Sequence, residues 1–228
     1  MPKTLLAVVS CHTRPEFSDA VRNTWASEIP KDKADTLFFM GKGPKIPKED
    51  EIILDCGDGH SDLPEKVREI VRWAYTHNYD HVFKIDDDVV LSPQSFLRSG
   101  FEKFDYIGYS PFGKEGCAER LAWTWGFCYG LSRKSMACII NAPSPCEEGD
   151  TVDICHKGND EYWVGRVLFQ KGIYLHPELR YHLRTGNATE QPEVPGVFLF
   201  CVHMHDSMSK PQEVHEICRI WRERCQNG

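Results

Sequence analysis

Short apolar runs alternate along the chain with segments whose apolar residues recur at helical spacing. The first run, TLLAVVSC (Thr4 to Cys11), is followed by a segment in which Phe17, Val21 and Trp25 share one helical face. The other runs that we predict as strands are TLFFMG, EIILDC, HVFKI, YIGYS, WGFCYGLS and YLHPELRYHL, and the other segments that we predict as helices are DLPEKVREIVRWA, RKSMACIINA, DEYWVGRVLFQKG and PQEVHEICRIWRERC. This alternation predicts an α/β fold with a mostly parallel central sheet flanked by helices on both faces.

Length and charge narrow the class of protein. A chain of 228 residues with 41% hydrophobic content is expected to form one domain over residues 1–228. The net charge of −7 argues against general nucleic-acid binding, which needs a basic surface, although it leaves room for a local basic groove.

The location of the protein in the cell depends on how the chain begins. No apolar run approaches the roughly 18 residues of a transmembrane helix, so we expect a cytoplasmic protein if Met1 is the native start. If the chain is truncated, the secretory lumen is the expected compartment. Ten cysteines are present without a CxxC pair, which disfavours a zinc ribbon but leaves disulfides open.

Three consecutive aspartates follow the apolar run HVFKI. Asp86 and Asp88 are two positions apart, so in an extended chain their side chains face the same way. Carboxylate oxygens are preferred ligands of Mg²⁺ and Mn²⁺, and a bound cation would relieve the repulsion between the three charges. The stretch predicts a metal site at the carboxyl end of a strand; a solvated acidic turn is the alternative.

Two further acidic residues, Asp160 and Glu161, precede an apolar helix. The positive end of a helix keeps a carboxylate ionised and able to accept a proton, so one of the two is a candidate general base. Acidic residues are also common in the first turn of helices that have no catalytic role. The segment by itself leaves both interpretations open.

The segment FCVHMHD carries two histidines, His203 and His205, that alternate along a predicted strand and therefore point to one face. Either imidazole could complete a metal site with the aspartates. A purely structural role, or a zinc cluster with Cys201, is the alternative.

Six segments together resemble a known family. They are VRNTW, DLPEKV, FKIDDDVV, WGFCYGLSRKSM, DEYWVG and VHMHDSMSKPQEVHEICRIW. In this order they resemble motifs of the β-1,3-glycosyltransferases of the galactosyltransferase and Fringe type. The resemblance implies the GT-A glycosyltransferase fold, which has a Rossmann-like nucleotide-binding half. For a truncated chain it also implies the Golgi as the compartment within the secretory pathway.

The resemblance also implies roles for individual residues. It assigns the metal to Asp88 and His203, with His205 as the alternative histidine. It places four residues at the donor, namely Arg22, Lys66, Asp86 and Asp87. The chain departs from the family at the base, because Glu161 occupies the position of the family's aspartate and Asp160 precedes it. We favour Glu161 as the base, with Asp160 as the alternative.

The function that the resemblance implies is an inverting hexosyltransferase that depends on Mn²⁺ or Mg²⁺. It would transfer galactose, glucose or an N-acetylhexosamine from a UDP-sugar to an acceptor hydroxyl and form a β-1,3 linkage on a glycan. The alternative function is that of a non-catalytic module that binds a nucleotide-sugar or a glycan.

A hydroxymethylated base in DNA is the alternative acceptor. It would require a basic surface at the edge of the site, here called the basic lip. The candidates for this lip are Arg180, His182, Arg184, Arg219, Arg222 and Arg224. The alternative is that these residues form an ordinary charged face in contact with solvent. A sugar acceptor could instead stack on aromatic rings. Four aromatic residues that could serve this purpose, or simply belong to the core, are Trp123, Trp125, Phe127 and Tyr129.

Overall fold

A computed structural model describes residues 2–44, 46–110, 123–145 and 158–178, together with the backbone of two strands at 181–184 and 201–204. The strands in this part of the chain are β1 (Thr4–Val9), β2 (Asp35–Met40), β3 (Glu51–Ile53), β4 (His81–Asp86), β5 (Val89–Leu91), β6 (Tyr106–Gly108), β7 (Cys128–Ser132), β8 (His176–Pro177), β9 (Tyr181–Arg184) and β10 (Cys201–Met204). The α-helices are α1 (Pro15–Asn23), α2 (Leu63–Thr76), α3 (Pro93–Leu97), α4 (Arg133–Ile140) and α6 (Asp160–Gln170), with 3-10 turns at Trp25–Glu28, His60–Asp62 and Phe101–Lys103.

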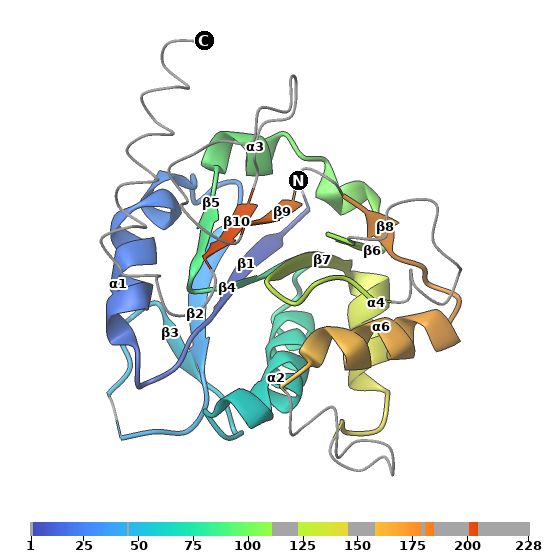
Figure 1. The fold of residues 1–228 in the computed structure, drawn as a ribbon, viewed down its shortest axis with the longest axis horizontal. Coiled ribbons are helices and arrows are strands. Elements are labelled where there is room, and N and C mark those ends of the chain that lie inside the picture. The colour runs from blue at the N-terminus through green and yellow to red at the C-terminus, as the bar shows by residue number, and fades with distance from the viewer. Residues whose placement is uncertain are drawn as a thin grey trace.

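The central sheet has seven strands in the order β3-β2-β1-β4-β7-β6-β8 (Figure 1). Strands β3, β2, β1 and β4 run parallel, whereas β7 is antiparallel to both of its neighbours. The register pairs Val9 at the end of β1 with Asp86 at the end of β4. The carboxyl ends of these two strands therefore meet at one edge of the sheet, where open α/β sheets bind their ligands.

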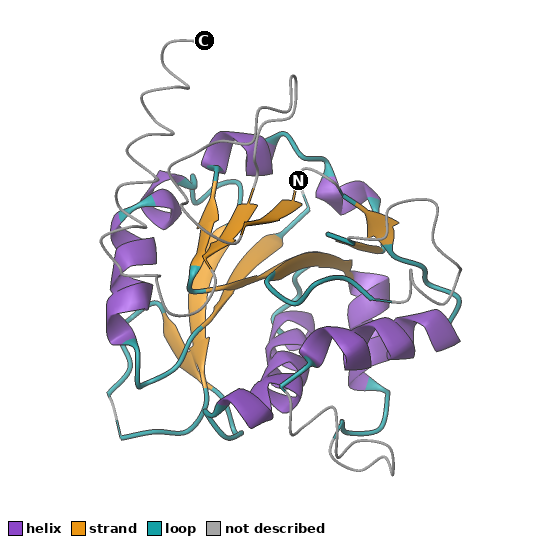
Figure 2. Cartoon of the chain, in the orientation of Figure 1, coloured by secondary structure: helices purple, strands orange, loops and turns teal. Residues whose placement is uncertain are grey.

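Helices cover both faces of the sheet (Figure 2). Alternate residues of β1 point to opposite faces, so Leu6 and Val8 pack with residues of α1 and α3, whereas Leu5 and Ala7 pack with residues of α2, α4 and α6. The mixed α/β architecture predicted from the alternating pattern is confirmed. None of the helices in the described ranges is long and apolar enough to span a membrane.

A second sheet has the order β5-β10-β9. Its strand β5 begins directly after the three aspartates, and β10 pairs antiparallel with it. The prediction of one strand over YLHPELRYHL is wrong, because this run is divided between β8 in the large sheet and β9 in the small one. Pro177 offers no N–H to a ladder and so does not continue a central strand. The predicted helix over 211–225 lies outside the described residues.

Candidate functional site

The three aspartates lie at the carboxyl edge of the central sheet, beside the loop that follows β1. Asp87 is buried and accepts hydrogen bonds from the Ser10 hydroxyl at 2.7 Å and from Nη2 of Arg14 at 3.0 Å. Burial raises the pKa of Asp87 to about 7; Arg14 opposes this shift, and the charges of Asp88 and Asp86 add to it. The middle carboxylate of the motif is therefore fixed in place by the protein.

Arg14 is a component of this site that the sequence did not reveal. Its guanidinium is about half exposed and also lies 3.9 Å from Oδ2 of Asp88. It thus places a solvent-accessible positive charge beside the aspartates. The only signal in the sequence is position, because Arg14 belongs to the segment that directly follows the first strand.

Lys66 and Asp58 hold the loops at this edge together. The buried Lys66 ammonium lies 2.8 Å from Oδ1 of Asp58 and donates to the carbonyl oxygen of Ser10 at 3.0 Å. Asp58 also accepts hydrogen bonds from the backbone N–H groups of His12 and Gly41, each at 2.7 Å. Burial raises the pKa of Asp58, but Lys66 and the two N–H groups outweigh it and lower the pKa. Lys66 therefore joins the loops that follow β1, β2 and β3.

Lys84 links the aspartate motif to the acidic start of α6. Its buried ammonium lies 2.7 Å from Oδ1 of Asp86 and 3.6 Å from Oδ2 of Asp160, and it donates to the carbonyl oxygen of Gly126. Burial lowers the pKa of Lys84, but the charges of Asp160 and Asp86 outweigh it and raise the pKa. Asp160 also accepts a hydrogen bond from the Tyr129 hydroxyl at 2.6 Å. Two motifs that are distant in the sequence thus share one buried cation.

Glu161 lies next to this network and is partly exposed. Burial, followed by the charge of Asp160, raises its pKa to about 8. A Cβ atom added to Gly126 would lie 2.8 Å from Oε2 of Glu161, so the backbone of Gly126 borders the carboxylate directly. A carboxylate with a proton affinity near neutrality is suited to general acid–base chemistry.

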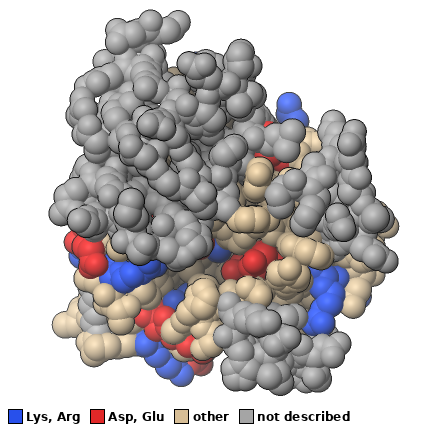
Figure 3. All heavy atoms as spheres, viewed as in Figure 1, with Lys and Arg blue, Asp and Glu red and all other residues tan. Residues whose placement is uncertain are grey.

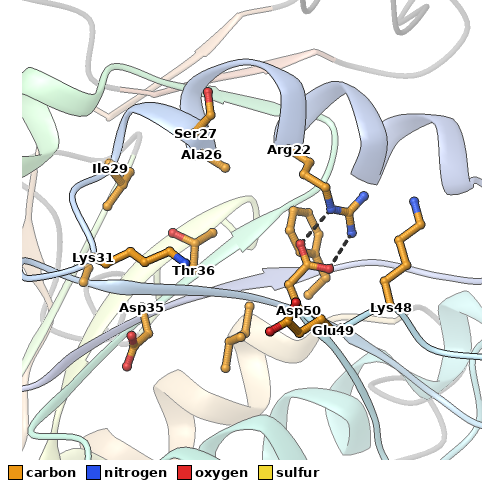
Figure 4. A pocket seen from close by; sticks show the side chains of 13 residues that line it. Arg22, Ala26, Ser27, Ile29, Lys31, Asp35, Thr36, Lys48, Glu49 and Asp50 are labelled. Atoms are coloured by element: carbon orange, nitrogen blue, oxygen red, sulfur yellow. Dashed lines mark hydrogen bonds and ion pairs between the residues drawn. The ribbon is translucent and has the colours of Figure 1, made fainter.

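Arg22 lies in another part of the molecule. It contacts Asp50 through two hydrogen bonds of 2.7 and 3.0 Å and Glu51 at 3.2 Å. It lines a pocket of about 690 Å³ between α1 and the start of β2 (Figure 4). The structure therefore brings Asp86, Asp160 and Lys84 together but pairs Arg22 with other acidic residues, and a donor role for Arg22 stays a prediction.

The histidine segment is described only by its backbone. In β10, His203 pairs with Val89 of β5, the residue that follows Asp88, and with Leu183 of β9. The strand register thus puts the position of His203 beside the end of the aspartate motif. His205 lies outside the described residues. Within the side chains that the structure describes, no three His, Cys, Asp or Glu residues form a metal-binding group.

The fold is similar to that of the galactosyltransferase LgtC, whose crystal structure was solved in complex with donor and acceptor sugar analogues. The TM-score is 0.55 and the sequence identity 9%, over 94% of this chain and 95% of that chain. No protein-family model and no curated protein sequence matches the chain. The predicted GT-A glycosyltransferase fold is therefore confirmed by structure, whereas membership of the β-1,3 family stays a prediction.

Proposed function

We propose that the protein is an inverting, metal-dependent glycosyltransferase that moves a hexose from a UDP-sugar to an acceptor hydroxyl. One observation carries this proposal: the aspartate motif and the acidic start of α6 converge through Lys84 at the carboxyl edge of a GT-A sheet. A β-1,3 linkage on a glycan is the outcome that the sequence resemblance implies.

The donor would bind where the loops after β1 and β4 meet. Asp87 is already fixed by Ser10 and Arg14, so little side-chain freedom would be lost when a donor binds. The exposed guanidinium of Arg14 is suited to a diphosphate, because its planar array of donors matches phosphate oxygens. Asp86, held by Lys84, would then face the ribose or the donor sugar.

The side chains that would hold the cation are of types that suit Mn²⁺ or Mg²⁺. Asp88, which is partly accessible, would supply carboxylate oxygens, and His203, whose backbone position pairs with Val89 directly after Asp88, would supply an imidazole, with His205 as the alternative. When bound, the cation would stabilise the negative charge of the departing diphosphate.

Glu161 is the base that the geometry favours. Asp160 is buried, and its Oδ2 atom contacts both Lys84 and Tyr129, so this oxygen is committed to holding the site together. Glu161 is partly exposed, and its raised pKa suits it to accept the proton of an acceptor hydroxyl. The hydroxyl oxygen would form a bond to the anomeric carbon as the bond to the diphosphate breaks. One such in-line step inverts the anomeric configuration.

Release of UDP from a panel of UDP-sugars tests the proposal, with Mn²⁺ or a chelator present. We expect metal-dependent release from one donor, its loss in Asp88→Ala, and a larger loss of activity in Glu161→Gln than in Asp160→Asn. The exposed Asp32 provides the matched control, because Asp32→Ala removes a carboxylate outside the proposed site. Metal-dependent donor binding without release from any sugar, with or without candidate acceptors, would instead favour a binding module.

A further inference from the structure

Three aromatic residues that are at least partly exposed lie near Glu161 along the chain or close to Gly126, which approaches its carboxylate. The ring of Trp123 stacks on that of Tyr162, with centroids 4.5 Å apart and planes inclined by 26°. Trp125 lies edge-on to Tyr109, and Trp125 and Tyr162 are 38% and 42% exposed. The partly exposed pair Trp123–Tyr162 and the exposed ring of Trp125 are each suited to contact a ligand with an apolar face.

The other two aromatic residues that the sequence analysis proposed for stacking on a sugar are too buried to contact a ligand. Phe127 and Tyr129 are both buried, and they pack in the cores on the two faces of the sheet. We therefore define the aromatic platform as Trp123, Trp125 and Tyr162.

The protein holds the segment that carries the two tryptophans without help from a ligand. The N–H of Trp125 and the hydroxyl of Thr124 both donate to the carbonyl oxygen of Tyr109, at 2.9 and 2.7 Å. The N–H of Thr124 donates to the Tyr106 hydroxyl at 3.0 Å. Because the backbone is fixed at both sides of Thr124, little conformational entropy would be lost when a ligand packs on the platform.

The platform residues are neighbours of the proposed base, either directly along the chain or through Gly126. Tyr162 directly follows Glu161 on α6, and Gly126, which directly follows Trp125, lies against the Glu161 carboxylate. We propose that the aromatic platform is the acceptor subsite and that its ligand is an uncharged carbohydrate whose pyranose ring packs its C–H face on these rings. This inference rests on the proposed transferase function.

The charge of the region favours a carbohydrate over DNA. The carboxylates of Glu161 and Asp160 both approach Gly126, the residue that follows Trp125, and the chain carries a net charge of −7. On the face shown in Figure 3, the described Lys and Arg side chains are interspersed with Asp and Glu and form no continuous basic surface. A phosphodiester chain would be repelled at such a surface, whereas a neutral sugar would not. The side chains of the basic lip that a DNA acceptor requires lie outside the described residues.

Calorimetric titration with neutral saccharides tests the subsite directly. The probes are lactose, N-acetyllactosamine, chitobiose and methyl β-glycosides, added to the full chain in the presence of UDP and Mn²⁺. We expect at least one to bind, and its Kd to rise by about tenfold in Trp125→Ala and in Trp123→Ala. Trp125→Phe should recover part of the affinity, because a ring remains. Tyr174→Ala is the matched control, since Tyr174 is 63% exposed and lies beyond the opposite end of α6.

The outcomes separate the subsite from the catalytic function. Saccharide binding that depends on the platform, without turnover of any UDP-sugar, would support the subsite and remove the transferase. UDP-sugar turnover with saccharide affinities unchanged in both alanine variants would overturn the subsite and leave the transferase. The carbohydrate assignment would also be overturned if no saccharide bound, or if a duplex carrying 5-hydroxymethylcytosine bound instead with strong salt dependence.

Discussion

The buried ammonium of Lys84 offers the sharpest test of how the site is assembled. Lys84→Met keeps a long, flexible side chain but removes the cation between Asp86 and Asp160. At separations of 2.7 and 3.6 Å, an effective dielectric constant of about 20 gives gross attractions of roughly 6 and 5 kcal/mol. The cost of desolvation offsets much of this. Removing one partner of a buried ion pair typically destabilises a protein by about 3–5 kcal/mol, a large part of the roughly 5–15 kcal/mol of a folded domain.

Urea unfolding followed by circular dichroism measures this loss. The pKa of Lys84 is raised in the folded state, so its contribution is fully present below the usual lysine pKa and is lost only as pH rises beyond it. We therefore expect a deficit throughout about pH 6 to 9 that grows as Glu161, which has a pKa of about 8 and lies near the ammonium, becomes ionised. Lys134→Met is the matched control, because Lys134 pairs with Asp105 at a similar distance, 2.6 Å, but on the exposed surface. Its effect should be much smaller.

A double substitution identifies the cause of the loss. In Lys84→Met with Asp160→Asn, no uncompensated charge remains at Asp160, so we expect more than half of the lost stability to return. The reasoning would be refuted if Lys84→Met behaved like the Lys134→Met control. It would also be refuted if the two substitutions at the site were simply additive, because independent residues show no coupling energy.

Three further predictions concern activity. With a Glu161 pKa of about 8, kcat/KM should rise with pH up to that value. Asp160→Asn removes a neighbouring negative charge and should therefore shift this rise to lower pH. A rise at unchanged pH in the variant would argue against Glu161 as the base. Arg14→Ala should raise KM for the UDP-sugar by about tenfold. Arg22→Ala tests the predicted role of Arg22 in binding the UDP-sugar: lower stability in urea with an unchanged KM would contradict that role. Gly126→Ala should preserve the unfolding midpoint yet lower kcat by about tenfold or more by displacing Glu161, and full activity would show that the carboxylate adapts.

Much of the fold was predictable from local patterns. The apolar runs and the helical spacing reflect a side chain's face within its own strand or helix, so they needed no knowledge of distant residues. The position of Asp86, Asp87 and Asp88 at the end of a strand followed from the same reasoning. The division of YLHPELRYHL between two sheets did not, because it depends on which strands are available as neighbours.

The assembly of the site was decided only by the tertiary structure. The residue patterns alone identified the aspartates, Asp160 and Glu161 as separate acidic groups, and only the family resemblance placed them in one site. Their connection depends on Lys84, whose buried position between them is set by how α6 packs against the sheet. In the same way, Ser10 meets Asp87 across 77 positions of sequence. A chain's periodicity determines which face of a strand or helix a residue occupies. The partner that the residue meets on that face depends on long-range packing. The strength of an electrostatic interaction changes steeply with the distance that this packing produces.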